Sequence, residues 1–422
     1  MFFSKRKVNT YQIVFSTIAL IFATALTHAK NPDAAGSASL TTLKEVFDAA
    51  WLRQPEARAI NLRRDAAQAQ AKVASQLSPE PAALEIIQRG DQMTGNYGSS
   101  ETYVGLAIPI WLPGQRDATG QLAQAEISFV ESKQLSAQLR VAFAVRDAWW
   151  NWQRTRIDNE LARLQLVNAS RLAVDVNRRV QAGELARADQ HQAEGAVQAA
   201  KANLAQSQAS FALALAQVQM LTGGATPSES NRTSVSEPEP PKGHDSPHPL
   251  LKELQDRIIV AERTVSLVSS QNRSNPQLTI GAKRDRSTYG ENYGQSILVG
   301  VRFPFGDGPR YDARVANAQA EAIEVHAQLQ LEKARLIADQ QAARSRVESV
   351  RVQLQASQRR AQLARESRGF FDKSFRLGES DLPTRLRIET EAIEAERQEA
   401  RTRIELGAAI SALRQTTGLL PE

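Results

Sequence analysis

The chain has 422 residues, a formal net charge of +6 and no cysteine. Without cysteine the sequence has no disulfide, no thiol nucleophile, no thiolate metal ligand and no cysteine to carry a lipid. Its 52 Lys and Arg residues are interspersed with 46 Asp and Glu residues. Beyond the N-terminus they form no basic run of the kind that binds nucleic acid, so we expect no nucleic-acid partner.

The first 29 residues are predicted to be a signal peptide for export through the Sec pathway. Residues 5–7 are all basic, residues 13–26 form an apolar stretch, and Ala29 supplies the small residue that signal peptidase requires. The alternative is a membrane anchor, but the apolar run is short and interrupted by hydroxyl side chains. The mature chain from Lys30 would carry a charge of +3, because the three basic residues are removed from the total of +6.

The sequence repeats itself. The segment VGLAIPI at residues 104–110 returns as VGVRFPF at residues 299–305, 195 positions later. The same offset relates Gly183-Glu184 to Gly378-Glu379. One structural unit of roughly 170 residues is therefore used twice, which favours a ring-like assembly over an enzyme with one asymmetric cleft.

Each repeat is predicted to contain the same elements in the same order. The first repeat, residues 30–223, holds a helix at 43–76, strands at 83–92 and 102–111, a long helix at about 115–180 and a return helix at about 186–221. Residues 224–247 form a linker. The second repeat, residues 248–422, holds a helix at 249–271, strands at 277–286 and 296–305, a long helix at about 310–375 and a return helix at about 384–416.

The strand segments come in pairs, each separated by a turn that contains Asn-Tyr-Gly, which is typical of a hairpin. Apolar side chains alternate along the second strand of each pair. They are Val104, Leu106, Ile108 and Ile110 in one repeat and Val299, Val301, Phe303 and Phe305 in the other. Ten alternating residues suit a tilted membrane strand, although a hairpin packed on helices would alternate equally well.

The long helix of the first repeat has no proline and one glycine, and its length corresponds to a rod of about 100 Å. The return helices carry the clearest coiled-coil pattern, with apolar or small residues spaced alternately four and three apart. In the first repeat this row is Ala193, Val197, Ala200, Leu204, Ser207, Phe211, Ala214, Val218 and Leu221. In the long helix a row through Leu139, Phe143, Trp150, Ile157 and Leu164 is predicted to form the seam. One protomer cannot bury such seams alone, so we expect oligomerisation.

The linker is rich in Ser, Pro, Glu and Asn and is predicted to be a surface loop. The residues His244, Asp245 and His248 at its end have side chains that can bind a metal ion. The segment nevertheless lacks a third ligand that is well placed for a metal site. We interpret this segment as a solvated loop and expect no bound metal and no cofactor. The sequence also lacks a Gly-rich phosphate loop, a serine elbow and a catalytic carboxylate pair, so we do not expect an enzyme.

On these elements the chain resembles the TolC family of outer-membrane efflux ducts. The resemblance rests on the tandem repeat, the strands that end in Ile108-Pro109-Ile110 and Phe303-Pro304-Phe305, and the Gly-containing turn between long and return helices. It implies a mainly α-helical homotrimer, in which four strands per protomer close a twelve-stranded outer-membrane β-barrel and a long coiled-coil α-barrel continues through the periplasm. It also implies two partners in a tripartite pump, a periplasmic adaptor (membrane fusion protein) and an inner-membrane RND-type transporter.

The turns between the long and return helices resemble the heavy-metal (Czc/Cus-type) branch of that family. The two segments are residues 182–189 and 377–383. The resemblance implies export of heavy-metal cations through a channel in the outer membrane, where the protein would contact lipid. Because the sequence has no cysteine, we do not expect the chain to be lipidated. The same fold serving efflux of drugs or organic compounds, or type I protein secretion, stays open, and so does a periplasmic coiled-coil adaptor or scaffold without a pore.

By this resemblance the two turns form the periplasmic tip and the gate. The candidate residues are Gly183, Glu184, Asp189, Gly378, Glu379, Asp381 and Arg387. In a trimer the acids would form carboxylate rings that favour cations. They would equally well cap the helices that begin there. The resemblance places Asp189 on an acidic gate position, whereas the corresponding positions of the second repeat hold Thr384 and Arg387.

Overall fold

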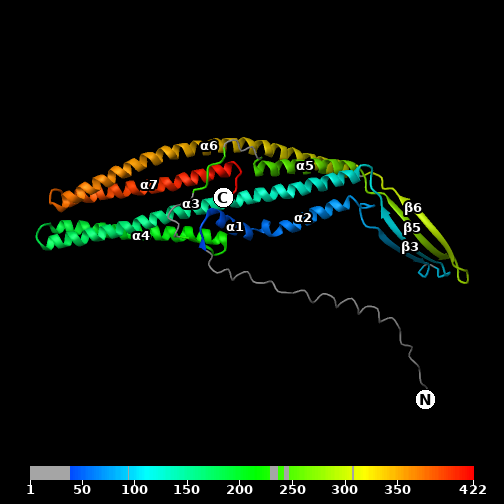
Figure 1. Ribbon diagram of the computed structural model, residues 1–422. Helices are drawn as coiled ribbons and strands as arrows, with labels where there is room; N and C mark the ends of the chain where they lie inside the picture. Colours follow the sequence, from blue (N-terminus) through cyan, green and yellow to red (C-terminus); the bar gives the residue numbers. More distant parts are fainter. Residues whose placement is uncertain (1–38, 94, 229–235, 242–246, 307) are drawn as a thin grey trace, which may run out of the picture. The chain divides into compact units, whose positions relative to one another are not determined.

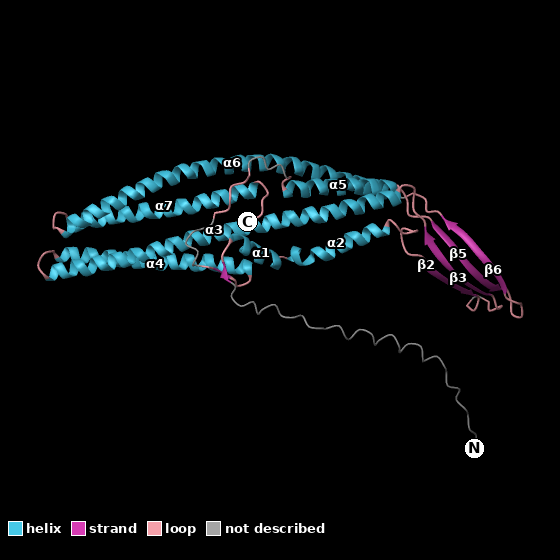
Figure 2. Cartoon of the chain, viewed as in Figure 1, coloured by secondary structure: helices cyan, strands magenta, loops and turns pink. Residues whose placement is uncertain are grey.

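The computed structural model describes residues 39–93, 95–228, 236–241, 247–306 and 308–422, which belong to one unit, Ser39–Glu422. The expected signal peptide and His244 lie outside the described residues. Long helices dominate the described unit, and four strands form one antiparallel sheet. This confirms the predicted fold class, mainly α with a small β part (Figure 2).

The chain enters the fold through a short strand, β1 (Ser39–Leu40), and two short helices, α1 (Leu43–Arg53) and α2 (Pro55–Val73). The sequence predicts a single helix over residues 43–76, and the structure divides it at Gln54. Gln54 is extended, with φ −67° and ψ 139°, because the ring of the following Pro55 disfavours the helical conformation in the residue before it.

The sheet contains β2 (Ala83–Gly90), β3 (Ser100–Pro109), β5 (Gln277–Arg286) and β6 (Gly294–Arg302) in that order. All three pairings are antiparallel. The outer pairings are the two predicted hairpins, one from each repeat. The central pairing joins β3 to β5, so the sheet is one place where the two repeats are held together.

The helices of each repeat form an antiparallel hairpin that runs away from the sheet. The first is α3 (Gln115–Gln181) with α4 (Arg187–Thr222), and the second is α6 (Pro309–Arg376) with α7 (Leu382–Thr416). Helix α5 (Pro249–Ser270) lies beside α3 and α6 at the sheet end. The turns of both hairpins lie at the opposite end from the sheet (Figure 1). Among the described helices, none is both long enough and apolar enough to cross a membrane.

The largest apolar core lies in the middle of the unit, where α1 packs on α3 and α4 and where Ile404 of α7 joins the same cluster. Its centre is a tryptophan cluster on α3, in which the ring centroids of Trp149 and Trp152 lie 5.1 Å apart. The α1 side chains Val46 and Phe47 pack against this cluster. Because all four elements contribute, this core joins both repeats at mid-length.

The seam predicted for α3 is only partly buried within one protomer, and its burial in an oligomer stays a prediction. Phe143 is 62% exposed and Leu164 is 54% exposed, although Leu139 and Trp150 of the same row are buried. The reason is that α3 contacts α1, α2, α4, α5 and α7. A helix with neighbours on several sides buries more than one stripe, so a single heptad row does not describe it.

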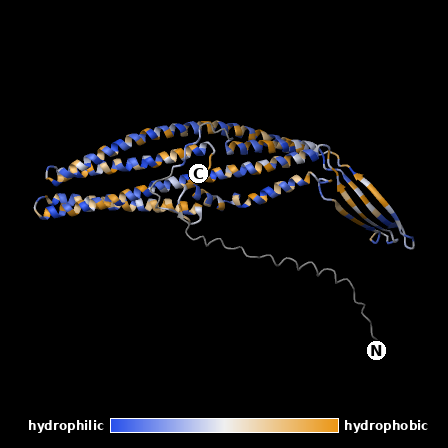
Figure 3. Ribbon diagram, viewed as in Figure 1, coloured by the Kyte–Doolittle hydropathy of each residue, from blue (hydrophilic) through white to orange (hydrophobic). Residues whose placement is uncertain are grey.

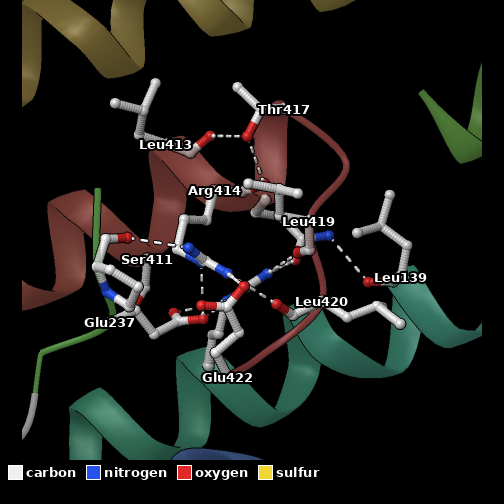
Figure 4. A network of polar contacts seen from close by, with 12 residues as sticks. Leu139, Glu237, Ser411, Leu413, Arg414, Thr417, Leu419, Leu420 and Glu422 are labelled. Atoms are coloured by element: carbon white, nitrogen blue, oxygen red, sulfur yellow. Dashed lines mark hydrogen bonds and ion pairs between the residues drawn. The ribbon is translucent and has the colours of Figure 1, made fainter. Parts of the chain in front are cut away.

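The linker is also more structured than predicted. Thr226–Pro227 form β4, which pairs in parallel with β1. Further along, Glu237 is only 4% exposed and lies between Arg146 of α3 and Arg414 of α7 (Figure 4). The part of the linker at 236–241 is therefore pinned to the helices, because a buried carboxylate is required to neutralise two buried arginines.

Candidate functional site

The two hairpin turns have the same backbone geometry. Gly183 and Gly378 adopt φ angles of 79° and 77°. In the first turn the N–H of Glu184 donates to the carbonyl of Arg179 at 2.9 Å, and in the second the N–H of Glu379 donates to Ser374 at 2.9 Å. Nothing lies within 4 Å of a Cβ built on either glycine, so the left-handed backbone and not crowding calls for glycine.

An aspartate caps the N-terminus of each return helix, but the two aspartates occupy different positions relative to the helix start. In α4 the carboxylate of Asp189 accepts the N–H of Ala186 at 3.0 Å, from inside the helix back to its cap. In α7 the carboxylate of Asp381 accepts the N–H of Thr384 at 3.1 Å, from the cap into the helix. In the repeat register, Asp381 corresponds to Ala186 and Thr384 to Asp189. Each turn thus has one capping acid.

The other predicted residues sit at the surface of the tip. Glu184, Glu379 and Asp381 are exposed, whereas Asp189 is half-buried. Arg387 is exposed as well and pairs with Glu391 of the same helix at 2.9 Å. Hydrogen bonds from the Thr384 hydroxyl and backbone N–H hold the pKa of Asp381 below its usual range. Asp381 is therefore charged at neutral pH and free on its outer side.

The residue that joins the two hairpins near the tip, Phe375, was not singled out from the sequence. Phe375 is 2% exposed, and the guanidinium carbons of Arg179 and Arg385 each lie 5.0 Å from its ring centroid. Arg179 of α3 also donates to the backbone carbonyl of Phe375 at 3.2 Å. Around the ring lie apolar residues from both hairpins, namely Leu172, Val176, Ala193 and Leu382.

Ion pairs surround this aromatic contact. Asp372 binds Arg376 and Arg385, both at 2.5 Å, and Asp175 binds Arg179 at 3.4 Å. Next to them is an open cavity of about 780 Å³, lined by charged residues of α3, α6 and α7. One signal for this region is visible in the sequence: Phe375 stands where the equivalent position of the first repeat holds Val180.

The sheet has one apolar face, and that face is exposed. The pairing places Leu84, Leu106, Ile280 and Val299 in one cross-strand row and Ile86, Val104, Ala282 and Ile297 in the next. In the first row the exposed fractions are 64%, 46%, 44% and 66%. Figure 3 shows the corresponding apolar stretches along the strands. A face of this kind, exposed to its surroundings, matches the alternation of a strand that contacts lipid on one side.

The opposite face is small and polar. Gly105 pairs with Gly281 there, under the ring of Tyr103. Nearer the turns, Glu101 lies between two cations, at 3.7 Å from Arg89 and 3.6 Å from Lys283. Lys283 also pairs with Asp285 at 3.6 Å. These charges are arranged as an aqueous surface requires, with opposite signs alternating across the strands.

Within the described residues, no cluster of three or more His, Asp or Glu side chains is placed to hold a metal ion. The interpretation of His248 as part of a solvated loop was wrong. His248 accepts the N–H of Leu250 at 3.3 Å and so caps α5, and burial lowers its pKa.

Comparison with known proteins agrees with this geometry. The family model described as "Outer membrane efflux protein" matches residues 46–224, which is most of the first repeat. No curated protein matches the sequence.

Several solved structures share the fold. One is a membrane protein from Pseudomonas aeruginosa, with a TM-score of 0.71, 17% identity, and coverage of 89% of this chain and 90% of that one. CusC has a TM-score of 0.72 and 16% identity, with coverage of 90% and 92%. The outer membrane protein VceC from Vibrio cholerae has a TM-score of 0.70 and 15% identity, with coverage of 89% and 96%.

The family match covers the first repeat, and the second repeat is a copy of the first in register and in fold. Residues 46–224 therefore match the outer membrane efflux protein family, and the solved structures share the fold of the described chain, which agrees with the resemblance to the TolC family. The matched family is one of outer-membrane efflux proteins, whose members are channels and not enzymes.

Proposed function

We propose that this chain is the outer-membrane duct of a tripartite RND-type pump and that the pump exports heavy-metal cations. The observation that carries the duct is the sheet, whose apolar face is exposed at one end of the helical hairpins while its other face is polar. A strand layer with one lipid-facing side and one aqueous side is what a membrane channel needs.

The proposed assembly is a homotrimer. Apolar side chains remain exposed on the outer surfaces of both hairpins, among them Phe143 at 62%, Leu213 at 65%, Leu331 at 73% and Val352 at 68%. Neighbouring copies of the chain would cover such residues, because exposed apolar patches of this extent mark interaction surfaces. Three copies bring twelve strands and twelve hairpin helices into one duct.

The proposed gate is the tip, where the adaptor would also dock. Within a protomer the two hairpins are linked there by Phe375 and the arginines that flank it. Opening requires the hairpins to separate at this level. The adaptor and the transporter would supply the free energy for that separation.

The proposed cargo rests on the tip residues. Their segments resemble the heavy-metal branch, and Glu184, Asp189, Glu379 and Asp381 would bring up to twelve carboxylates to the mouth of a trimer. Rings of carboxylates concentrate cations. The structural likeness does not choose the cargo, because at 16% and 15% identity CusC and VceC share only the fold with this chain.

The experiment compares the wild type with the Asp189→Asn/Asp381→Asn double variant in planar bilayers and in cells challenged with metal. Asparagine retains an acceptor for the cap while it removes the charge, so the fold is preserved. We expect reduced cation selectivity and lower metal tolerance. The variant Glu324→Gln, which neutralises an exposed acid in the first quarter of α6 and far from the tip, is the control. Unchanged selectivity together with full metal tolerance would refute the role of the acids and the metal cargo.

A further inference from the structure

The apolar face of the sheet changes its chemistry toward the two hairpin turns. One row beyond Ile86, Val104, Ala282 and Ile297, the cross-strand residues are Gln88, Thr102, Arg284 and Gln295. In the following row Ser100 pairs with Arg286. Arg284 and Arg286 therefore project from the same face as the exposed apolar residues, at its edge. The only charged residues on this face of the four strands are these two arginines.

Aromatic side chains hold the two guanidinium groups in place. The Cζ atom of Arg284 lies 4.1 Å from the ring centroid of Tyr293, and that of Arg286 lies 4.9 Å from the same centroid. Arg286 also lies over Tyr289 at 5.6 Å and donates from Nε to the carbonyl of Gly98 at 3.1 Å. Both cations are thereby ordered on one aromatic ring before any ligand arrives.

Neither arginine is neutralised by an acid. In the part of the chain that the structure describes, no carboxylate lies within ion-pair distance of Arg284 or Arg286. The nearest acids along the chain are already engaged: Asp285 points to the opposite face and pairs with Lys283 at 3.6 Å, and Glu291 accepts the N–H groups of Ser287 and Thr288 at 2.8 and 3.3 Å. Two adjacent, unneutralised guanidinium groups form a site for an anion.

The position of Arg284 and Arg286 beside the apolar rows of the sheet indicates the chemical class of the anion. A molecule that contacts these arginines also contacts the apolar rows beside them, so it carries acyl chains next to its negative charge. Arginine binds phosphate through paired hydrogen bonds. We propose that Arg284 and Arg286 bind the phosphate groups of lipid A, the anchor of lipopolysaccharide in the outer leaflet. This inference depends on the proposed function, because it requires the sheet to span the outer membrane with its turns at the cell surface.

The test measures binding of lipid A to the purified full-length protein in detergent. Native mass spectrometry or a fluorescent lipid A reports the bound lipid, and three ligands are compared: bisphosphorylated lipid A, its dephosphorylated form and phosphatidylglycerol. We expect the bisphosphorylated form to bind best. The Arg284→Gln/Arg286→Gln variant should bind it roughly tenfold more weakly, because it loses charged hydrogen bonds to phosphate.

The matched control is Arg89→Gln, which removes an exposed cation from the same end of the sheet but from its other face. Its binding should equal that of the wild type. If the glutamine variant fails to assemble, Arg284→Lys/Arg286→Lys replaces it, and intermediate binding is expected because the charges remain without the paired donors. Equal binding of dephosphorylated lipid A or of phosphatidylglycerol, or full binding by the double variant, overturns the proposal.

Conductance of the same wild-type preparation in planar bilayers distinguishes a failure of the lipid A site from a failure of the proposed channel function. A conducting channel without preference for phosphorylated lipid A refutes only the lipid site. A preparation that neither inserts nor conducts refutes the proposed function and the lipid site with it.

Discussion

At the scale of single residues, the acids of the tip have a structural role that the repeat makes visible. Asp189 and Asp381 close equivalent turns from positions three residues apart in the repeat register. The sequence left two readings of these acids open, as charged rings and as helix caps. The structure places both in cap geometry, while the outward side of Asp381 stays available for cations.

The cap at Asp381 predicts a dependence on pH. The pKa of Asp381 is lowered from 3.8 mainly by the hydrogen bond from the Thr384 side chain, so its contribution to stability is complete above pH 3.8 and is lost as the pH falls through the lower pKa of the folded state. We expect the melting temperature to fall more between about pH 5 and about pH 3 in the wild type than in Asp381→Asn, whose cap does not titrate. Equal losses in both proteins would contradict the cap.

Individual residues also show where sequence reasoning stops. The turn glycines and the acids beside them were found because a helix reversal has a local signature. Phe375 was not found, because its importance comes from Arg179 of the other repeat, which no local pattern connects to it. Contacts between distant segments are decided by packing.

At the scale of elements, the number of neighbours of a helix decides how well a single heptad row predicts its burial. Each return helix packs mainly on its own long helix, so a single heptad row is buried, as seen at Ala193, Ala200, Ala214 and Val218. Helix α3 has neighbours on several sides, and Phe143 and Leu164 of its predicted seam stay exposed within one protomer. Periodicity predicts burial where an element has one dominant partner.

The contact between hairpins predicts a gating variant. Arg179→Met retains an unbranched side chain that fills similar space, but it removes the hydrogen bond to the Phe375 carbonyl and the cation over the Phe375 ring. We expect a higher conductance of the closed channel in planar bilayers, because the hairpins are less firmly held. Arg178→Met, an exposed neighbour, is the control and should behave as wild type. A closed-state conductance equal to that of the control would show that this contact does not hold the gate.

The linker predicts a large effect from one substitution. Glu237 accepts two hydrogen bonds from Arg146, at 2.7 and 3.0 Å, and lies 3.3 Å from Arg414 (Figure 4). Glu237→Gln leaves two buried arginines without their shared carboxylate, and we expect a loss of about 3–5 kcal/mol in the free energy of unfolding. Denaturant unfolding measures it, with Glu239→Gln, an exposed residue of the same segment, as the control. A loss below about 1 kcal/mol would indicate that the segment adds little.

This residue also shows why the linker was described only in part from its sequence. Its composition is that of a surface loop, and composition does not reveal that a particular side chain such as Glu237 is buried. Glu237 looks like any other solvated acid until Arg146 and Arg414, from the two repeats, are brought to it.

At the scale of the whole molecule, the two faces of the sheet decide how the protein would sit in a membrane. Leu106→Lys places a charge on the apolar face, and we expect it to cost about 2–4 kcal/mol of stability in a bilayer. Thr279→Lys, on the adjacent strand but on the other face, is the matched control and should cost much less. Refolding into lipid vesicles gives both values. Equal costs would mean that the apolar face does not contact lipid.

The central claim is that the chain spans the outer membrane with its sheet turns outside and its helix tips in the periplasm. Because the sequence contains no cysteine, one introduced cysteine reports one position. A membrane-impermeant maleimide should label Asn96→Cys in intact cells, but Glu184→Cys only after the outer membrane is permeabilised. Labelling of Glu184→Cys in intact cells, or of Asn96→Cys only after permeabilisation, would contradict the account.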